Sequence, residues 1–124
     1  MHRYLLHNTY LFPTSQDLQK TWKCLEAVKA SGKAKSIGVS NMQRNHIEAI
    51  LKVASDVPAI NQLEYHRYLQ RANDYAPWMR EQGIEVSSFK GLAPITVGKG
   101  GPLDGPLESI AKSHGVAADA VLLR

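Results

Sequence analysis

The stretch that decides the fold is Gly32-Lys33-Ala34-Lys35-Ser36-Ile37-Gly38-Val39-Ser40-Asn41. Its centre, residues 36–39, is a short apolar run that contains β-branched residues, which predicts a strand. Gly32 precedes this run, at a place where a helix is expected to end. Ser40 and Asn41 follow it, so the stretch predicts a strand with two polar side chains at its carboxyl end.

Three more runs of the same kind lie along the chain, and helical patterns separate them. Leu18, Trp22, Leu25 and Val28 recur at spacings of four and three, so they share one face of a helix. Pro77 lies inside the third helical pattern and predicts a kink or a late start there. The predicted strands cover residues 3–6, 36–39, 59–63 and 84–89. The predicted helices run from an N-cap at Ser15 to Gly32, from an N-cap at Asn41 to residue 54, over residues 69–82, from Pro106 to Gly115, and over residues 117–123.

Strands that alternate with helices predict a parallel sheet with right-handed crossovers. Two α/β architectures satisfy this order, an open doubly wound sheet and part of a (β/α)8 barrel. In both, the ligand site lies at the carboxyl ends of the strands. Polar or aromatic residues follow every predicted strand, namely His7, then Ser40 and Asn41, then Gln62, Glu64 and His66, then Phe89 and Lys90.

Four segments resemble the aldo-keto reductase family, in the family's order. Residues 4–7, Tyr-Leu-Leu-His, are similar to the strand that ends in its catalytic histidine, and residues 32–41 are similar to its Ser-Asn signature. Residues 58–66 carry the family's Asn-Gln-x-Glu-x-His pattern, and residues 83–89, followed by Leu92, resemble the next strand. The resemblance implies a partial TIM (β/α)8 barrel, about a (β/α)4 half-barrel, with residues 1–124 forming one partial oxidoreductase domain.

The resemblance also implies a chemistry, the NAD(P)H-dependent reduction of an aldehyde or ketone to an alcohol. The implied cofactor is NADPH, with NADH possible, and the implied partner is a small carbonyl compound. His7 corresponds to the catalytic histidine, which orients the carbonyl oxygen. Ser40, Asn41 and Gln62 correspond to the residues that hold the nicotinamide carboxamide, which needs both donors and acceptors. Phe89, Lys90 and Leu92 complete the implied cofactor-binding set.

The family's catalytic aspartate, tyrosine and lysine have no counterpart in the matching segments. We therefore expect an internal part of a barrel that is inactive alone. A non-catalytic nucleotide-binding or regulatory half-barrel is the alternative, and an unrelated α/β binding module is a third. Two open strand edges, with an inner face of residues such as Ile37, Val39, Ile60 and Val86, also predict self-association.

Composition excludes several other classes. The chain has 124 residues, a net charge of +4 and one cysteine, Cys24, which rules out an internal disulfide. No basic run is interleaved with aromatic residues, and no apolar run approaches the roughly 18 residues of a membrane span, so neither nucleic acid nor a membrane is expected as a partner. Glu64 and His66 lack a third ligand, so no metal is expected. These features predict a cytoplasmic protein.

Overall fold

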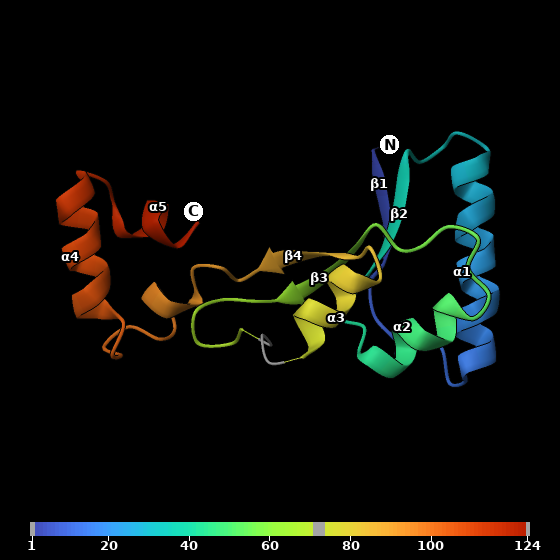
Figure 1. Cartoon of the computed structure of the whole chain (residues 1–124), viewed down its shortest axis with the longest axis horizontal. Helices are drawn as coiled ribbons and strands as arrows, with labels where there is room; N and C mark the ends of the chain where they lie inside the picture. The colour runs from blue at the N-terminus through green and yellow to red at the C-terminus, as the bar shows by residue number, and fades with distance from the viewer. Residues whose placement is uncertain (1, 71–73, 124) are drawn as a thin grey trace. The chain divides into compact units, whose positions relative to one another are not determined.

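In the computed structural model, which describes residues 2–70 and 74–123, strands and helices alternate along the chain (Figure 1). The strands are β1 (Arg3–Leu6), β2 (Ser36–Ser40), β3 (Ile60–Glu64) and β4 (Glu85–Phe89). The helices are α1 (Ser15–Ala30), α2 (Arg44–Leu51), α3 (Tyr75–Glu81), the 3-10 turn η1 (Ala93–Ile95), α4 (Asp104–His114) and α5 (Ala118–Leu122). All four predicted strands are therefore confirmed, with bounds that differ by one residue at most.

The four strands form one sheet in the order β1-β2-β3-β4. The pairs β1–β2 and β2–β3 are parallel, with Leu6 opposite Val39 and Ser40 opposite Gln62. A doubly wound sheet reverses its strand order at a switch point, and this sheet does not. The sequential order is that of a (β/α)8 barrel segment, which decides between the two architectures left open by the sequence.

Helices α1, α2 and α3 cover the same face of this sheet. Their buried side chains, which include Trp22, Ile47 and Met79, form one core with Val39 and Ile84 of the strand segments. Figure 1 shows α1 running beside β1 and β2. In (β/α)8 barrels the ligand site lies at the carboxyl ends of the strands, so the residues that follow β1, β2 and β3 are the candidate site.

The expected composition of the inner face is wrong for three residues. Ile37 and Val39 are 1% and 0% exposed, because they point toward the helices and belong to the core. Side chains alternate along a strand, so Gly38 lies on the opposite face, where a Cβ atom would meet Leu5 and Ile60. Of the four residues predicted for the inner face, Val86 also packs against the core cluster.

Three predicted helix starts are wrong by a few residues. Thr14, not Ser15, caps α1, since its Oγ1 accepts a hydrogen bond from the Asp17 backbone N–H at 3.2 Å. Gln43, not Asn41, is the N-cap of α2. Helix α4 begins at Asp104, so that Pro106 falls in its first turn, where proline costs no helical hydrogen bond.

The third predicted helix is shorter than expected. Helix α3 begins at Tyr75, which makes Pro77 its third residue and confirms the late start. The structure leaves residues 71–73 of that predicted helix undescribed. Helix α5 lies within the predicted residues 117–123.

The chain divides into two compact units. The first, Met1–Leu63 with Ala72–Ser87, contains α1, α2, α3 and most of the sheet. The second, Glu64–Arg71 with Ser88–Arg124, contains η1, α4 and α5. Among the helices that the structure describes, none is long and apolar enough to cross a membrane.

Candidate functional site

Asn41 joins the ends of three neighbouring strands in the first unit. It follows β2 directly and has a positive φ of 55°, which asparagine tolerates better than most residues do. Its backbone N–H donates to the Gln62 carbonyl oxygen at 2.9 Å. Its side-chain Nδ2 donates to the His7 carbonyl oxygen at 3.0 Å. The predicted residues His7, Asn41 and Gln62 are therefore brought together by hydrogen bonds.

Ser40 is buried beneath this junction, with 2% of its surface exposed. Its Oγ donates to the Gln62 carbonyl oxygen at 2.8 Å and accepts from Asn41 Nδ2 at 3.2 Å. Within the described residues, neither Asn41 Oδ1 nor the Gln62 side-chain amide takes part in a hydrogen bond. The junction therefore keeps an acceptor and a complete amide available to a ligand.

His7 is exposed at the end of β1 and lines a cavity of about 390 Å³ together with Asn41. The Asn8 amide nitrogen lies 3.3 Å from His7 Nδ1. An amide N–H donated to Nδ1 favours the tautomer that carries its hydrogen on Nε2. This tautomer presents Nε2 as a donor, which is what a carbonyl oxygen needs.

The sequence interpretation missed His46, which lines the same cavity. The Gln43 backbone N–H donates to His46 Nδ1 at 3.1 Å, so the side chain closes the first turn of α2. The sequence does contain a signal for this contact. A polar residue three positions after an N-cap is the spacing of a capping box.

The remaining predicted cofactor residues lie in the second unit. Lys90, which has a positive φ of 55°, places its Nζ 6.0 Å from the centre of the Phe89 ring. Leu92 is half-buried, and its carbonyl oxygen accepts from Thr96 Oγ1 at 3.1 Å. The assignment of Phe89, Lys90 and Leu92 to a cofactor stays a prediction from the resemblance.

Lys90 is engaged in an ion pair. Its Nζ lies 3.2 Å from Glu64 Oε2, and His66 Nε2 lies 3.5 Å from Glu64 Oε1. The hydrogen bond from Lys90 lowers the pKa of Glu64 below its usual value, and His66 adds to the effect. The structure brings together no group of three or more potential metal ligands within the part of the chain that it describes.

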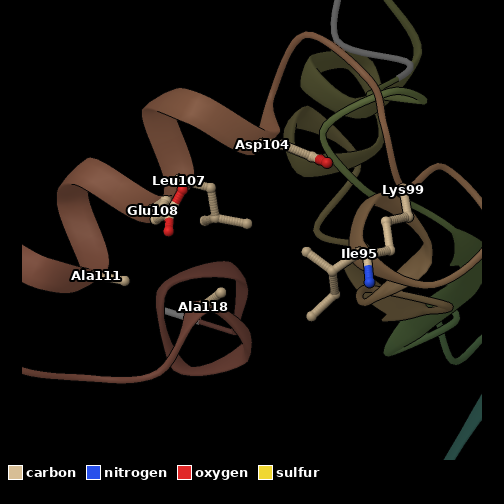
Figure 2. Close-up of a pocket in the computed structure, with 7 residues that line it drawn as sticks. All are labelled: Ile95, Lys99, Asp104, Leu107, Glu108, Ala111 and Ala118. Atoms are coloured by element: carbon tan, nitrogen blue, oxygen red, sulfur yellow. The ribbon is translucent and has the colours of Figure 1, made fainter.

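The second unit also contains an open pocket of about 350 Å³ that none of the predicted site residues lines. Figure 2 shows Leu107 on α4, Ala118 on α5 and Ile95 facing it. The polar lining residues are Lys99, Asp104 and Glu108, but Asp104 Oδ2 already accepts from the Gly100 backbone N–H at 2.8 Å. Neither the predicted catalytic residue His7 nor any predicted cofactor-binding residue lines this pocket.

Comparisons with known proteins place both units of the chain in one family. The profile of the Aldo/keto reductase family matches residues 3–124. D-galacturonate reductase of Hypocrea jecorina is 38% identical over 104 residues, which cover 82% of this chain and 32% of that protein. Glyoxal reductase of Bacillus subtilis is 34% identical over 122 residues, which cover 98% of this chain and 41% of that protein.

Solved structures give the same result. An aldo/keto reductase from Brucella melitensis superimposes with a TM-score of 0.82 at 27% identity, covering 99% of this chain and 44% of that chain. A Gox0644 variant in complex with NADPH has a TM-score of 0.79 at 32% identity, covering 98% of this chain and 42% of that chain. The chain thus spans less than half the length of these relatives. With a family profile that matches nearly every residue, the chain belongs to the aldo/keto reductase family.

Proposed function

We propose that this chain forms the nicotinamide-binding part of an NADPH-dependent carbonyl reductase, with His7 beside the carbonyl oxygen of the substrate. The observation that carries the proposal is the junction in which Asn41 links the ends of β1, β2 and β3. That junction joins Ser40, Asn41 and Gln62 through the hydrogen bonds of 2.8–3.2 Å described above.

The chemistry of the junction suits a carboxamide. A carboxamide presents one carbonyl oxygen and one NH₂ group, so its binding site needs at least one donor and one acceptor. The Gln62 amide offers both, and Asn41 Oδ1 offers a second acceptor. Ser40 holds the Gln62 backbone in place, since its hydroxyl donates to that carbonyl. The solved relative in complex with NADPH supports the choice of cofactor.

In this proposal the protein side chains orient the substrate, and NADPH, when bound, supplies the hydride. His7 donates a hydrogen bond from Nε2 to the carbonyl oxygen, which positions the carbonyl carbon and stabilises the negative charge that develops on the oxygen. The oxygen must then take up a proton to form the alcohol. The implied tyrosine donor has no counterpart in the matching segments, so we expect these 124 residues to bind NADPH without turnover.

The test measures NADPH binding to the chain by the change in the fluorescence of the reduced nicotinamide. The variant is Asn41→Gly, because glycine keeps the positive φ and removes only the side-chain amide. Loss of one or two hydrogen bonds should raise the Kd about tenfold, which corresponds to about 1.4 kcal/mol. Asn45→Ala is the matched control, since Asn45 is exposed on α2 and removing its amide should leave the Kd unchanged.

Turnover is measured separately, as NADPH oxidation with a small reactive aldehyde. Binding that depends on Asn41 without turnover supports the proposal and also fits the regulatory alternative. Turnover that disappears in His7→Ala would show that these residues catalyse the reaction by themselves. An equal Kd for the wild type and Asn41→Gly would contradict the assignment of the junction to the carboxamide.

A further inference from the structure

We propose that Tyr75 and Asn61 form a clamp that holds Asn41 in the left-handed conformation its function requires. The clamp is made of the Tyr75 hydroxyl, the Asn61 side-chain amide and the Met42 carbonyl group. The inference rests on the proposed function of Asn41 and assigns Tyr75 and Asn61 as positioning residues, which contact neither cofactor nor substrate.

The clamp consists of hydrogen bonds to the residue after Asn41. The Met42 carbonyl oxygen accepts from Asn61 Nδ2 at 3.0 Å and also from the Tyr75 hydroxyl. The Tyr75 oxygen in turn accepts from Asn61 Nδ2 at 2.9 Å. Two donors from two different elements, β3 and α3, therefore fix one carbonyl group of the connection between β2 and α2.

The Met42 carbonyl group is buried, so its position depends on its two hydrogen-bond donors. Met42 is 1% exposed and Asn61 is 0% exposed. A buried hydrogen bond excludes water, so a displaced Met42 carbonyl would have no solvent partner to replace Asn61 and Tyr75. The clamp therefore restricts the backbone one residue beyond Asn41.

The conformation of Asn41 needs such a restraint. A non-glycine residue at positive φ is strained, and strained residues persist where the surrounding contacts determine them. Asn41 has hydrogen bonds on its side chain and its N–H, to His7 and Gln62. The clamp adds a restraint on the other side of the residue, at Met42, so that the backbone of Asn41 is held from both directions.

Close packing alone does not explain why an asparagine occupies position 61. Its Oδ1 is buried and has no hydrogen-bond partner among the described residues. Leaving a buried acceptor unsatisfied is unfavourable, and an apolar side chain of similar shape would avoid that cost. The amide is accounted for by its Nδ2 group, which donates to Met42 and Tyr75.

The first test is amide hydrogen exchange in Tyr75→Phe, which removes only the hydroxyl group. We expect the Asn41 N–H to exchange about fivefold faster relative to the Ala59 N–H, as expected for the loss of one ordinary hydrogen bond. The Ala59 N–H bonds to Ile37 at the opposite end of the same strand pair and is the internal reference. Tyr68→Phe, which removes a hydroxyl that accepts from the Leu103 N–H, is the control variant.

A purely structural role would give a different pattern. If Tyr75 only stabilised the fold, exchange at Asn41 and Ala59 would increase by the same factor in Tyr75→Phe, and the proposal would be overturned. Unchanged exchange at Asn41 would overturn it as well. The Asn61→Leu variant removes the orphaned oxygen together with the donor, so we expect its melting temperature to be maintained while exchange at Asn41 still increases.

The second test is a double-mutant cycle with NADPH affinity as the readout. Tyr75→Phe should raise the Kd about threefold to tenfold in the wild-type background. In the Asn41→Gly background it should change the Kd by less than about 1.5-fold, because glycine needs no restraint at positive φ and carries no amide to position. Equal effects in both backgrounds would overturn the inference. If the wild type binds no NADPH, the proposed function fails, and the exchange experiment alone decides whether the clamp exists.

Discussion

Gly38 offers a sharp test of how closely β2 and β3 must approach to build the junction. A Cβ atom at this position would lie 2.8 Å from the Ile60 carbonyl oxygen and 2.9 Å from Leu5 Cδ2. Ordinary contact begins at 3.4 Å, so Gly38→Ala requires the Ile60 carbonyl to move by about 0.6 Å, which is 3.4 minus 2.8. Because that atom belongs to the backbone of β3, it cannot move without displacing the strand.

The expected cost follows from overpacking. Inserting a methyl group into a filled space lowers the stability by about 1–3 kcal/mol. Because the nearest atom belongs to the backbone of β3 and cannot easily move, we expect Gly38→Ala to lower the free energy of unfolding by about 2 kcal/mol. For a chain of this size that corresponds to a fall in melting temperature of about 8 °C. We also expect faster hydrogen exchange at the Asn41 N–H, whose acceptor, the Gln62 carbonyl, lies two residues beyond Ile60 on β3.

The measurement is thermal unfolding followed by circular dichroism, with Gly105→Ala as the matched control. Gly105 lies in α4, and no atom would touch a Cβ placed there. Because Gly105 is exposed in the first turn of α4, alanine there should change the stability by less than about 0.5 kcal/mol. A Gly38→Ala variant as stable as the wild type, with unchanged exchange at Asn41, would refute the argument that β2 and β3 need glycine at this contact.

Two further predictions concern other parts of the chain. Thr14→Ala should destabilise the protein by about 1 kcal/mol through loss of the cap of α1, whereas Ser15→Ala should have little effect, and the two melting temperatures distinguish the observed cap from the expected one. Lys90→Gln should raise the pKa of Glu64 toward its usual value of 4.5, as measured by NMR of the carboxyl carbon. Since the pKa of Glu64 is lowered in the folded state, the ion pair stabilises the protein above pH 4.5, and this contribution is lost as the pH falls through the folded-state pKa. An unchanged pKa of Glu64 in Lys90→Gln would rule out Lys90 as the main cause of the lowered value.

The strands could be predicted because their signal is local. Residues 37–39 are apolar and include two β-branched residues, and Gly32 and Ser40 mark the two ends of the segment. The order of the strands within the sheet could not be read from local pattern, because both candidate architectures alternate strands and helices. The match to the family supplied that choice, and the observed sheet order confirms it.

The face of each strand residue was harder to predict. Ile37 and Val39 are both β-branched, and on a half-barrel either face could hold them. The deciding contacts come from Trp22 and Ile47, which lie in separate helices and create the core that covers one face. The contacting residues are distant in sequence, so the composition of the strand does not predict which of its faces packs against the helices.

Asn41 shows a second limit of local reasoning. Asparagine directly before a helical pattern predicts an N-cap, and the same residue type is also one of the few that tolerate positive φ. In the structure Asn41 adopts positive φ and does not cap α2. The Gln62 carbonyl on β3 accepts from its backbone N–H, and the His7 carbonyl accepts from its side-chain amide. Gln62 is 21 residues from Asn41 in the sequence and His7 is 34 residues from it, so a local pattern does not reveal these partners.

Alternation along β2 and β3 explains why one short stretch supports both the fold and the site. On β3, Gln62 lies opposite Ser40 at the end of the sheet, while its neighbour Asn61 is turned toward the helices and reaches Met42 and Tyr75. A slip of one residue would exchange these two side chains, burying Gln62 and exposing Asn61. The close contact between Gly38 and Ile60 acts against such a slip, because only a glycine fits opposite the Ile60 carbonyl in this register. The glycine of the deciding stretch therefore favours this register, and the register determines which amide faces the proposed nicotinamide site and which holds the Met42 backbone.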